Sequence, residues 1–208
     1  MTTTRTVLIP PARLVRWFEN FVERHGAASY DVVEGTLRAC ALDGATAVAT
    51  LPFGRPYAGD AEPSAVVDGV VAPDRWGVLL VRKGGFAVER LAGQRVVESK
   101  VGQRHVQGRT KAGGQSQQRF ARRRDNQARQ AYEAAAEHAA RILNGPLDAL
   151  VCGGDHTAVD AVLADARLRR LAELRVDPWL PVPDPRRTVL DQAVADAGSV
   201  SVTVTELA

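Results

Sequence analysis

The tripeptide Gly113-Gly114-Gln115 is the segment of this 208-residue chain whose residue types best fit a catalytic role. Two adjacent glycines let the backbone adopt positive φ values and approach another molecule closely, because no side chain stands in the way. The neutral amide of Gln115 can orient a water molecule, and its backbone N–H can stabilise an oxyanion. An activated ester needs mainly a positioned water for hydrolysis. The tripeptide therefore fits ester hydrolysis, although three residues alone are a weak motif.

Basic residues surround this tripeptide. Between Arg95 and Gln130 there are ten of them against two acidic residues, which gives the segment a net charge of +8. The whole chain has 27 basic and 24 acidic residues, so the remainder has 17 and 22 and a net charge of −5. A positive field confined to one segment is typical of a nucleic-acid partner. The expected phosphate contacts come from five side chains: Arg109, Lys111, Arg119, Arg122 and Arg123.

A meander and a long helix are predicted on the two sides of this segment. Three strand-like runs precede it, and their short glycine-containing connections indicate antiparallel pairing; they are residues 76–82, 86–91 and 95–101. Residues 102–114 have few apolar side chains and are predicted to form a loop. Apolar residues then recur at helical spacing from about Ser116 to Leu143, before a stop at Asn144-Gly145-Pro146.

The remaining elements predict an α/β (α+β) fold, in which helices pack on a mixed sheet that contains the meander. The expected elements are a strand at 6–9, a helix at 11–25, a hairpin around Asp43-Gly44, a loop at 52–74, a strand at 149–152, a helix at 157–174, a proline-rich turn, a helix at 187–197 and a strand at 200–205. The predicted segments are an N-terminal helix plus hairpin at 1–54, a loop or linker at 55–74 and a domain carrying the tripeptide at 75–208. Together they are expected to form one compact unit.

The run from His105 to Arg124 resembles the middle domain of the eukaryotic and archaeal class-I peptide chain release factors. There a basic, glycine-rich loop ends in Gly-Gly-Gln-Ser and leads into Arg-Phe-Ala-Arg on a long helix, as it does here. The resemblance covers roughly residues 76–207 and is specific from Lys111 to Arg122. With no room for a codon-reading domain before the loop, the chain is similar to the bacterial, actinobacterial-type branch of the VLRF family. That family is related to the eukaryotic ribosome quality-control factor Vms.

The resemblance implies a release-factor middle-domain-like, RNase H-like fold and a codon-independent peptidyl-tRNA hydrolase. Such an enzyme would free nascent chains from stalled large ribosomal subunits, with Gly113, Gly114 and Gln115 positioning the attacking water. The implied partners are the large ribosomal subunit, its rRNA and the acceptor end of peptidyl-tRNA. We expect a monomer. The two cysteines and four histidines are scattered, so no metal site and no cofactor are expected. No apolar run approaches the ~20 residues of a membrane span, so a cytoplasmic protein without a membrane partner is expected.

Two other functions stay open at this point. One is an endonuclease that cuts the tRNA acceptor end, although the loop lacks the clustered carboxylates of a two-metal nuclease. The other is a non-catalytic factor that binds the ribosome or RNA. A separate hydrolase site is also conceivable in the run Cys152-Gly-Gly-Asp-His156, which would place a nucleophile near a base. We prefer to interpret Cys152 as a core residue and Asp155 as a helix cap.

Overall fold

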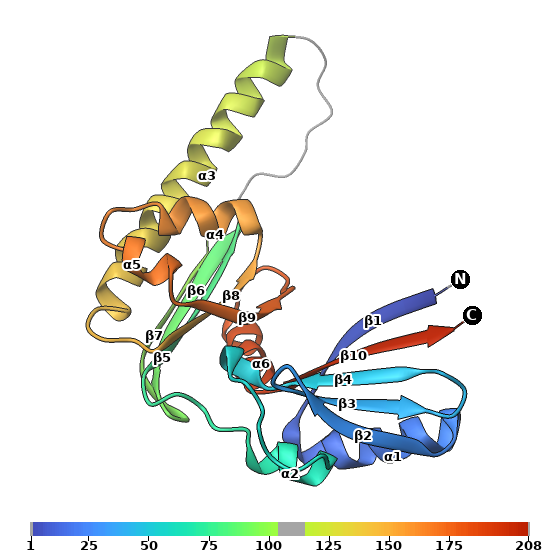
Figure 1. Cartoon of the computed structure of the whole chain (residues 1–208). Helices are drawn as coiled ribbons and strands as arrows, with labels where there is room; N and C mark the ends of the chain where they lie inside the picture. Colours follow the sequence, from blue (N-terminus) through green and yellow to red (C-terminus); the bar gives the residue numbers. More distant parts are fainter. Residues whose placement is uncertain (1, 104–114, 208) are drawn as a thin grey trace. The chain divides into compact units, whose positions relative to one another are not determined.

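The computed structural model describes residues 2–103 and 115–207 (Figure 1). The chain divides into two compact units: residues 1–72 together with 194–208 form the first unit, and residues 73–193 form the second. Each unit is built on a five-stranded sheet. The first sheet is antiparallel throughout and the second is mixed. The predicted α+β class is therefore confirmed, with one sheet more than was expected.

The first unit has strands in the order β1-β10-β4-β3-β2 and helices on one face of the sheet. Its strands are β1 (Thr2–Ile9), β2 (Ala28–Val33), β3 (Thr36–Ala41), β4 (Thr46–Thr50) and β10 (Val200–Leu207), and its helices are α1 (Pro11–His25), the 3-10 helix η1 (Pro52–Gly54) and α2 (Pro63–Asp68).

Helix α1 supplies much of the core of the first unit. Pro11 occupies its first turn, where the missing N–H costs nothing, and Gly26 ends it with a φ of 86° that favours glycine. Leu14, Phe18 and Phe21 share one helix face and are buried against alternate residues of the strands. The predicted helix and the hairpin at Asp43-Gly44 are both confirmed.

The second unit has strands in the order β7-β6-β5-β8-β9. Its strands are β5 (Trp76–Arg82), β6 (Gly85–Ala92), β7 (Arg95–Gln103), β8 (Ala149–Gly154) and β9 (Arg175–Leu180), and its helices are α3 (Gln115–Ile142), α4 (His156–Leu163), α5 (Arg169–Ala172) and α6 (Arg187–Ala197), whose last turn belongs to the first unit.

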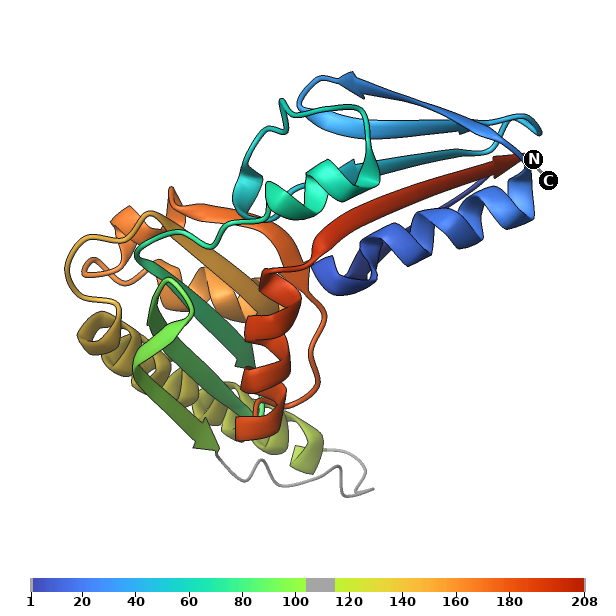
Figure 2. The ribbon, with the colours of Figure 1, turned by 90° about the horizontal axis from the view of Figure 1, so that it is seen from below.

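Helices cover both faces of this mixed sheet. Phe86 and Val88 of β6 pack in one core with α3 and α4, whereas Glu89, the next residue, faces Arg187 of α6 on the other side. Figure 2 shows α3 and α6 on opposite faces of the sheet. The predicted meander, the long helix and the helix at 187–197 are confirmed.

Four predictions from the sequence were wrong in detail. The supposed loop at 52–74 contains η1 and α2, which pack Val66 into the core. The predicted helix at 157–174 is split into α4 and α5. The reason is that Asp165 accepts a hydrogen bond from the backbone N–H of Arg167 at 2.9 Å, and this local bond competes with the helix. Strands β2 and β9 were missed, β9 because the sequence around Pro178 indicated a turn.

The last strand pairs differently from what the sequence indicated. The sequence pattern groups residues 200–205 with the domain at 75–208, but β10 lies between β1 and β4 in the sheet of the first unit. Such pairing joins residues 151 to 205 positions apart, and no local pattern specifies it. The division of the chain into segments at residues 54 and 74 stays a prediction.

Candidate functional site

Strand β7 and helix α3 frame the segment that carries the predicted chemistry. β7 ends at Gln103 and α3 begins at Gln115, so Gln115 is the first helical residue. Four predicted site residues lie outside the described part of the chain, namely Arg109, Lys111, Gly113 and Gly114. The other three, Arg119, Arg122 and Arg123, lie within the first turns of α3.

The carboxyl ends of four strands meet at the edge from which this segment departs. In the register of the sheet, Gly85 pairs with both Gln103 of β7 and Arg82 of β5. Val81 pairs with Gly154 of β8, and β9 runs parallel to β8. Such an edge is where open α/β sheets place their ligands. The sequence predicted the meander, and the two parallel strands extend this edge.

Helix α3 is anchored at its carboxyl half and extends beyond the sheet at the other. Small residues face the sheet and let the helix pack closely, and they are almost fully buried: Ala131, Ala135, Ala136 and Ala139. The ring of His138 stacks on Phe86 with a centroid distance of 5.4 Å, and Arg141 pairs with Glu98 of β7.

The first turns of α3 lie past the end of the sheet (Figure 1). At 1.5 Å per residue, the helical residues before Ala131 span about 22 Å. A helix held rigidly at one end therefore presents Gln115 at the other.

A buried carboxylate on the opposite face of the sheet braces the strand that leads to this segment. Glu89 of β6 is 1% exposed, and its Oε2 atom lies 3.6 Å from Nη1 of Arg187. The same Nη1 atom donates to Oγ of Ser99 on β7 at 2.8 Å, and Nε of Arg187 lies 2.9 Å from Asp191. Burial raises the pKa of Glu89, although Arg187 acts against the shift. This network was not predicted from the sequence. The feature that marks it there is Glu89, a glutamate within the otherwise mostly apolar strand β6.

The run from Cys152 to His156 has the geometry of a strand-to-helix turn. Cys152 is 2% exposed, and burial raises the pKa of its thiol to about 12, so the thiolate that a nucleophile requires does not form near neutral pH. Asp155 caps α4 by accepting from the backbone N–H of Ala158 and the hydroxyl of Thr157. His156 stacks on Trp179. The interpretation of Cys152 as a core residue and Asp155 as a cap is confirmed.

Within residues 2–103 and 115–207, histidine, cysteine, aspartate and glutamate side chains form no group of three or more that could hold a metal ion. No helix of this part of the chain is both long and apolar enough to cross a lipid bilayer.

Comparison with known proteins gives one family match and several structural alignments. Residues 74–203 match the family described as Actinobacteria/chloroflexi VLRF1 release factor. No curated protein matches the chain. An archaeal translation termination factor, aRF1, aligns with a TM-score of 0.44 and 14% identity, over 93% of this chain and 64% of its own. Pelota from Archaeoglobus fulgidus aligns with a TM-score of 0.32 and 10% identity, over 93% and 62%. The chain thus spans less than two thirds of the length of these two structures.

Proposed function

Because this chain belongs to the Actinobacteria/chloroflexi VLRF1 release factor family, we propose that it hydrolyses peptidyl-tRNA on stalled large ribosomal subunits and does so without reading a codon. The observation that carries the proposal is the family match over residues 74–203, which includes the whole segment between β7 and α3. Where this segment meets α3, the sequence reads Gly113-Gly114-Gln115-Ser116. The proposed site of action is the cytoplasm.

The chemistry assigned to Gln115 is to position a water against the ester that joins peptide and tRNA. As the first residue of α3, Gln115 has a backbone N–H without an acceptor inside the helix. That N–H lies at the positive end of the helix dipole, where developing negative charge on an oxyanion or a departing ribose oxygen is stabilised. Its side-chain amide can hold the water by donating to it or accepting from it. The two glycines allow the close approach to RNA that this placement needs.

Contact with the ribosome is assigned to the basic segment. The sequence from Arg95 to Gln130 contains ten cationic side chains and only two acidic ones. Arg119, Arg122 and Arg123 follow Gln115 on α3, which extends beyond the edge of the sheet. Arginine pairs with phosphate through two parallel N–H bonds, so these residues and the preceding Arg109 and Lys111 are proposed to hold rRNA and the tRNA acceptor end.

The test uses purified large subunits that carry peptidyl-tRNA labelled on both the peptide and the RNA. The wild-type chain is expected to release free peptide and leave tRNA with its normal terminus. A shortened tRNA would instead establish nuclease cleavage. Binding without any release would establish a non-catalytic factor. A matched reaction with no codon in the decoding site checks codon independence.

Gln115→Ala supplies the residue-level test. We expect it to abolish release while subunit binding stays within about twofold of wild type, because the amide contributes to the transition state more than to binding. The matched control is Gln130→Ala, which removes an exposed glutamine of the same helix and is expected to release at the wild-type rate. Release by Gln115→Ala at the rate of this control would contradict the assignment.

A further inference from the structure

A small cavity in the first unit lies between α1 and the β1–β10 side of the sheet. Its volume is about 220 Å³, and the polar and aromatic residues that line it are Arg5, Trp17, Asn20, Phe21, Arg24 and His25. All of them lie outside residues 74–203, so the family match gives no role for this cavity. We refer to it below as the α1 cavity.

Three rings of α1 form one wall of the α1 cavity. Trp17, Phe21 and His25 are spaced four residues apart and therefore share one face of the helix. The rings of Trp17 and Phe21 are nearly parallel, with an interplanar angle of 13° and centroids 5.9 Å apart. Phe21 and His25 follow at 4.8 Å. This wall is a continuous aromatic surface, with the amide of Asn20 beside it.

The sheet forms the opposite wall, at the place where the residues on its inner face change from apolar to charged. Along β10, Val200, Val202 and Val204 are buried under the helices. The next residue on that face is Glu206, and Arg5 is paired with Val204 on the neighbouring strand. Charged residues at positions that the pattern assigns to the core often mark a functional site.

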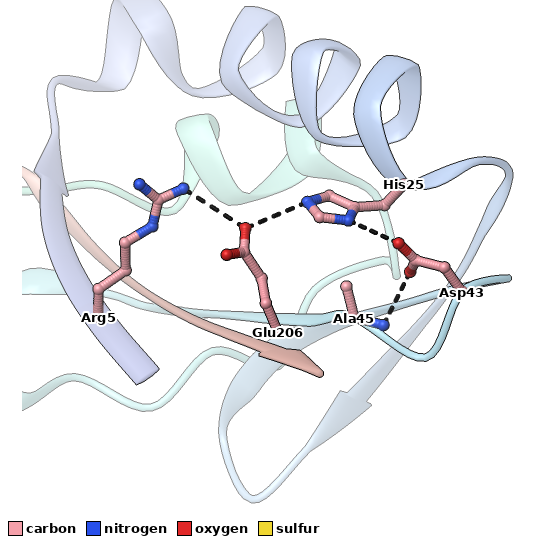
Figure 3. A network of polar contacts seen from close by, with 5 residues as sticks. All are labelled: Arg5, His25, Asp43, Ala45 and Glu206. Carbon is pink, nitrogen blue, oxygen red and sulfur yellow. Dashed lines mark hydrogen bonds and ion pairs between the residues drawn. The ribbon is translucent and has the colours of Figure 1, made fainter. Parts of the chain in front are cut away.

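A chain of polar contacts holds these residues in place (Figure 3). Nη2 of Arg5 lies 3.6 Å from Oε1 of Glu206, which lies 3.3 Å from Nε2 of His25. The other ring nitrogen, Nδ1, lies 2.8 Å from Oδ2 of Asp43. Asp43 in turn accepts from the backbone N–H of Ala45 at 2.9 Å. The His25 side chain is only 9% exposed, so the network fixes one side of the cavity before any ligand binds.

We propose that the α1 cavity binds one nucleotide, either a free mononucleotide or an unpaired nucleotide of an RNA chain. The base lies against the ring of Trp17 and hydrogen-bonds to the amide of Asn20, which both donates and accepts. The phosphate lies between the guanidinium groups of Arg5 and Arg24, whose N–H groups match its oxygens. Arg24 is exposed and stands outside the network of Figure 3, and it offsets the negative end of α1. The cavity is smaller than the roughly 300–1,000 Å³ of sites for drug-sized ligands, and one base with its nearest substituents matches that size.

The proposal is tested by equilibrium binding to the full chain, without ribosomes. The probes are the four nucleoside monophosphates, a single-stranded RNA tetranucleotide and inorganic phosphate, with heat or tryptophan fluorescence as the readout. Saturable binding of a monophosphate identifies a free nucleotide as the ligand, and saturable binding of the tetranucleotide alone identifies RNA. Phosphate binding as tightly as either would overturn the assignment of the base. No saturable binding of any probe would overturn the proposal and leave Arg5 as a charge that protects an edge strand from pairing.

Variants on α1 locate the site. Arg24→Ala is expected to raise the Kd about tenfold, because a charge-assisted phosphate contact is lost. Trp17→Phe is expected to weaken the binding of nucleotide more than the binding of inorganic phosphate, because the substitution reduces only the stacking surface. Arg13→Ala is the matched control, an exposed arginine of α1 that does not line the cavity, and it should bind as wild type does. Equal binding by Arg24→Ala and Arg13→Ala would overturn the site. Gln115→Ala should bind nucleotide normally, so this test succeeds or fails independently of peptide release.

Discussion

Arg187 of α6 reaches Glu89 of β6 across the face of the mixed sheet, with Nη1 of the guanidinium 3.6 Å from Oε2 of the carboxylate. That Oε2 atom is buried and has no hydrogen-bond partner among the described residues. Desolvation of the carboxylate therefore outweighs the attraction of Arg187, and the pKa of Glu89 is raised. Glu89 lies on β6, which pairs with β7, the strand that leads into the Gly-Gly-Gln segment.

Glu89→Gln is predicted to change how stability depends on pH. A carboxyl group whose pKa is raised by folding contributes stability below its ordinary pKa of about 4.3, and this contribution is lost as the pH rises through the folded value. Glutamine does not ionise, so the variant does not lose this contribution. Its free energy of unfolding should therefore rise relative to that of wild type as the pH increases. Denaturant unfolding from pH 4 to pH 8 measures the difference. Glu137→Gln, at an exposed position of α3, is the control, and a difference from wild type that is the same at every pH for both variants would contradict the prediction.

Removing Arg187, the partner of Glu89, should destabilise the fold more than removing the charge of Glu89 does. Arg187→Ala leaves a buried carboxylate without its cation and is expected to lower the free energy of unfolding by about 1–3 kcal/mol. In the double variant with Glu89→Gln, the cost should be smaller, because no unpaired charge remains. Urea unfolding of the four proteins gives the coupling energy, and additive effects of the two substitutions would show that the pair does not interact.

Helix α3 should be sensitive to size at its buried alanines. Ala139 is 0% exposed, so Ala139→Leu forces three extra carbon atoms into a packed interface and is expected to cost about 1–3 kcal/mol. Glu137→Leu, two residues earlier on the exposed side of the helix, should stay within about 0.5 kcal/mol of wild type. Thermal unfolding of both variants checks the expectation. Equal stability would show that α3 is not closely packed at Ala139.

Cys152 should behave as a core residue in chemical labelling. Its buried thiol has a pKa of about 12, so an alkylating reagent at pH 8 should modify it only when the protein unfolds. Cys40, which is partly exposed, provides the internal reference. Cys152→Ala should release peptide at the wild-type rate. Rapid modification of Cys152 in the folded chain, or loss of release in the alanine variant, would reopen a catalytic role for the thiol.

Reversing charge on the first turns of α3 should change how binding depends on salt. Each phosphate contact contributes about 0.9 to the slope of log K against log salt for duplex nucleic acid, so Arg122→Glu with Arg123→Glu should reduce the slope by about 2. Arg13→Glu with Arg186→Glu reverses two exposed arginines elsewhere in the chain and serves as the control. Subunit binding between 50 and 200 mM salt, roughly the range in which such contacts weaken, gives both slopes. Identical slopes for the two double variants would remove Arg122 and Arg123 from the RNA-binding surface.

The sequence predicted the elements that local pattern specifies. Pro11 and Gly26 bracket α1, and the glycine-containing turns between residues 82 and 95 force β5, β6 and β7 into a meander. It could not predict β9, where Pro178 indicates a turn. The proline is tolerated because β9 is an edge strand, which leaves one side of its backbone without partners.

The candidate site was predicted from the sequence only in part. The frame of strand, loop and helix around Gly113 to Gln115 follows from glycine content and helical spacing. The contacts that brace this frame, such as Arg187 with Glu89 and Arg141 with Glu98, join residues at least 43 positions apart. Nothing local marks those pairs, because they exist only once the sheet and the helices have packed.

Strand β10 has a consequence for the order in which the chain folds. It lies between β1 and β4, although residues 73–193, the entire second unit, separate it from them in the sequence. The second unit is contiguous and can close its own sheet as soon as those residues are synthesised. Until residues 200–207 are synthesised, β1 and β4 each lack the partner strand that β10 later provides. Their unpaired edges expose the first unit to aggregation during that interval.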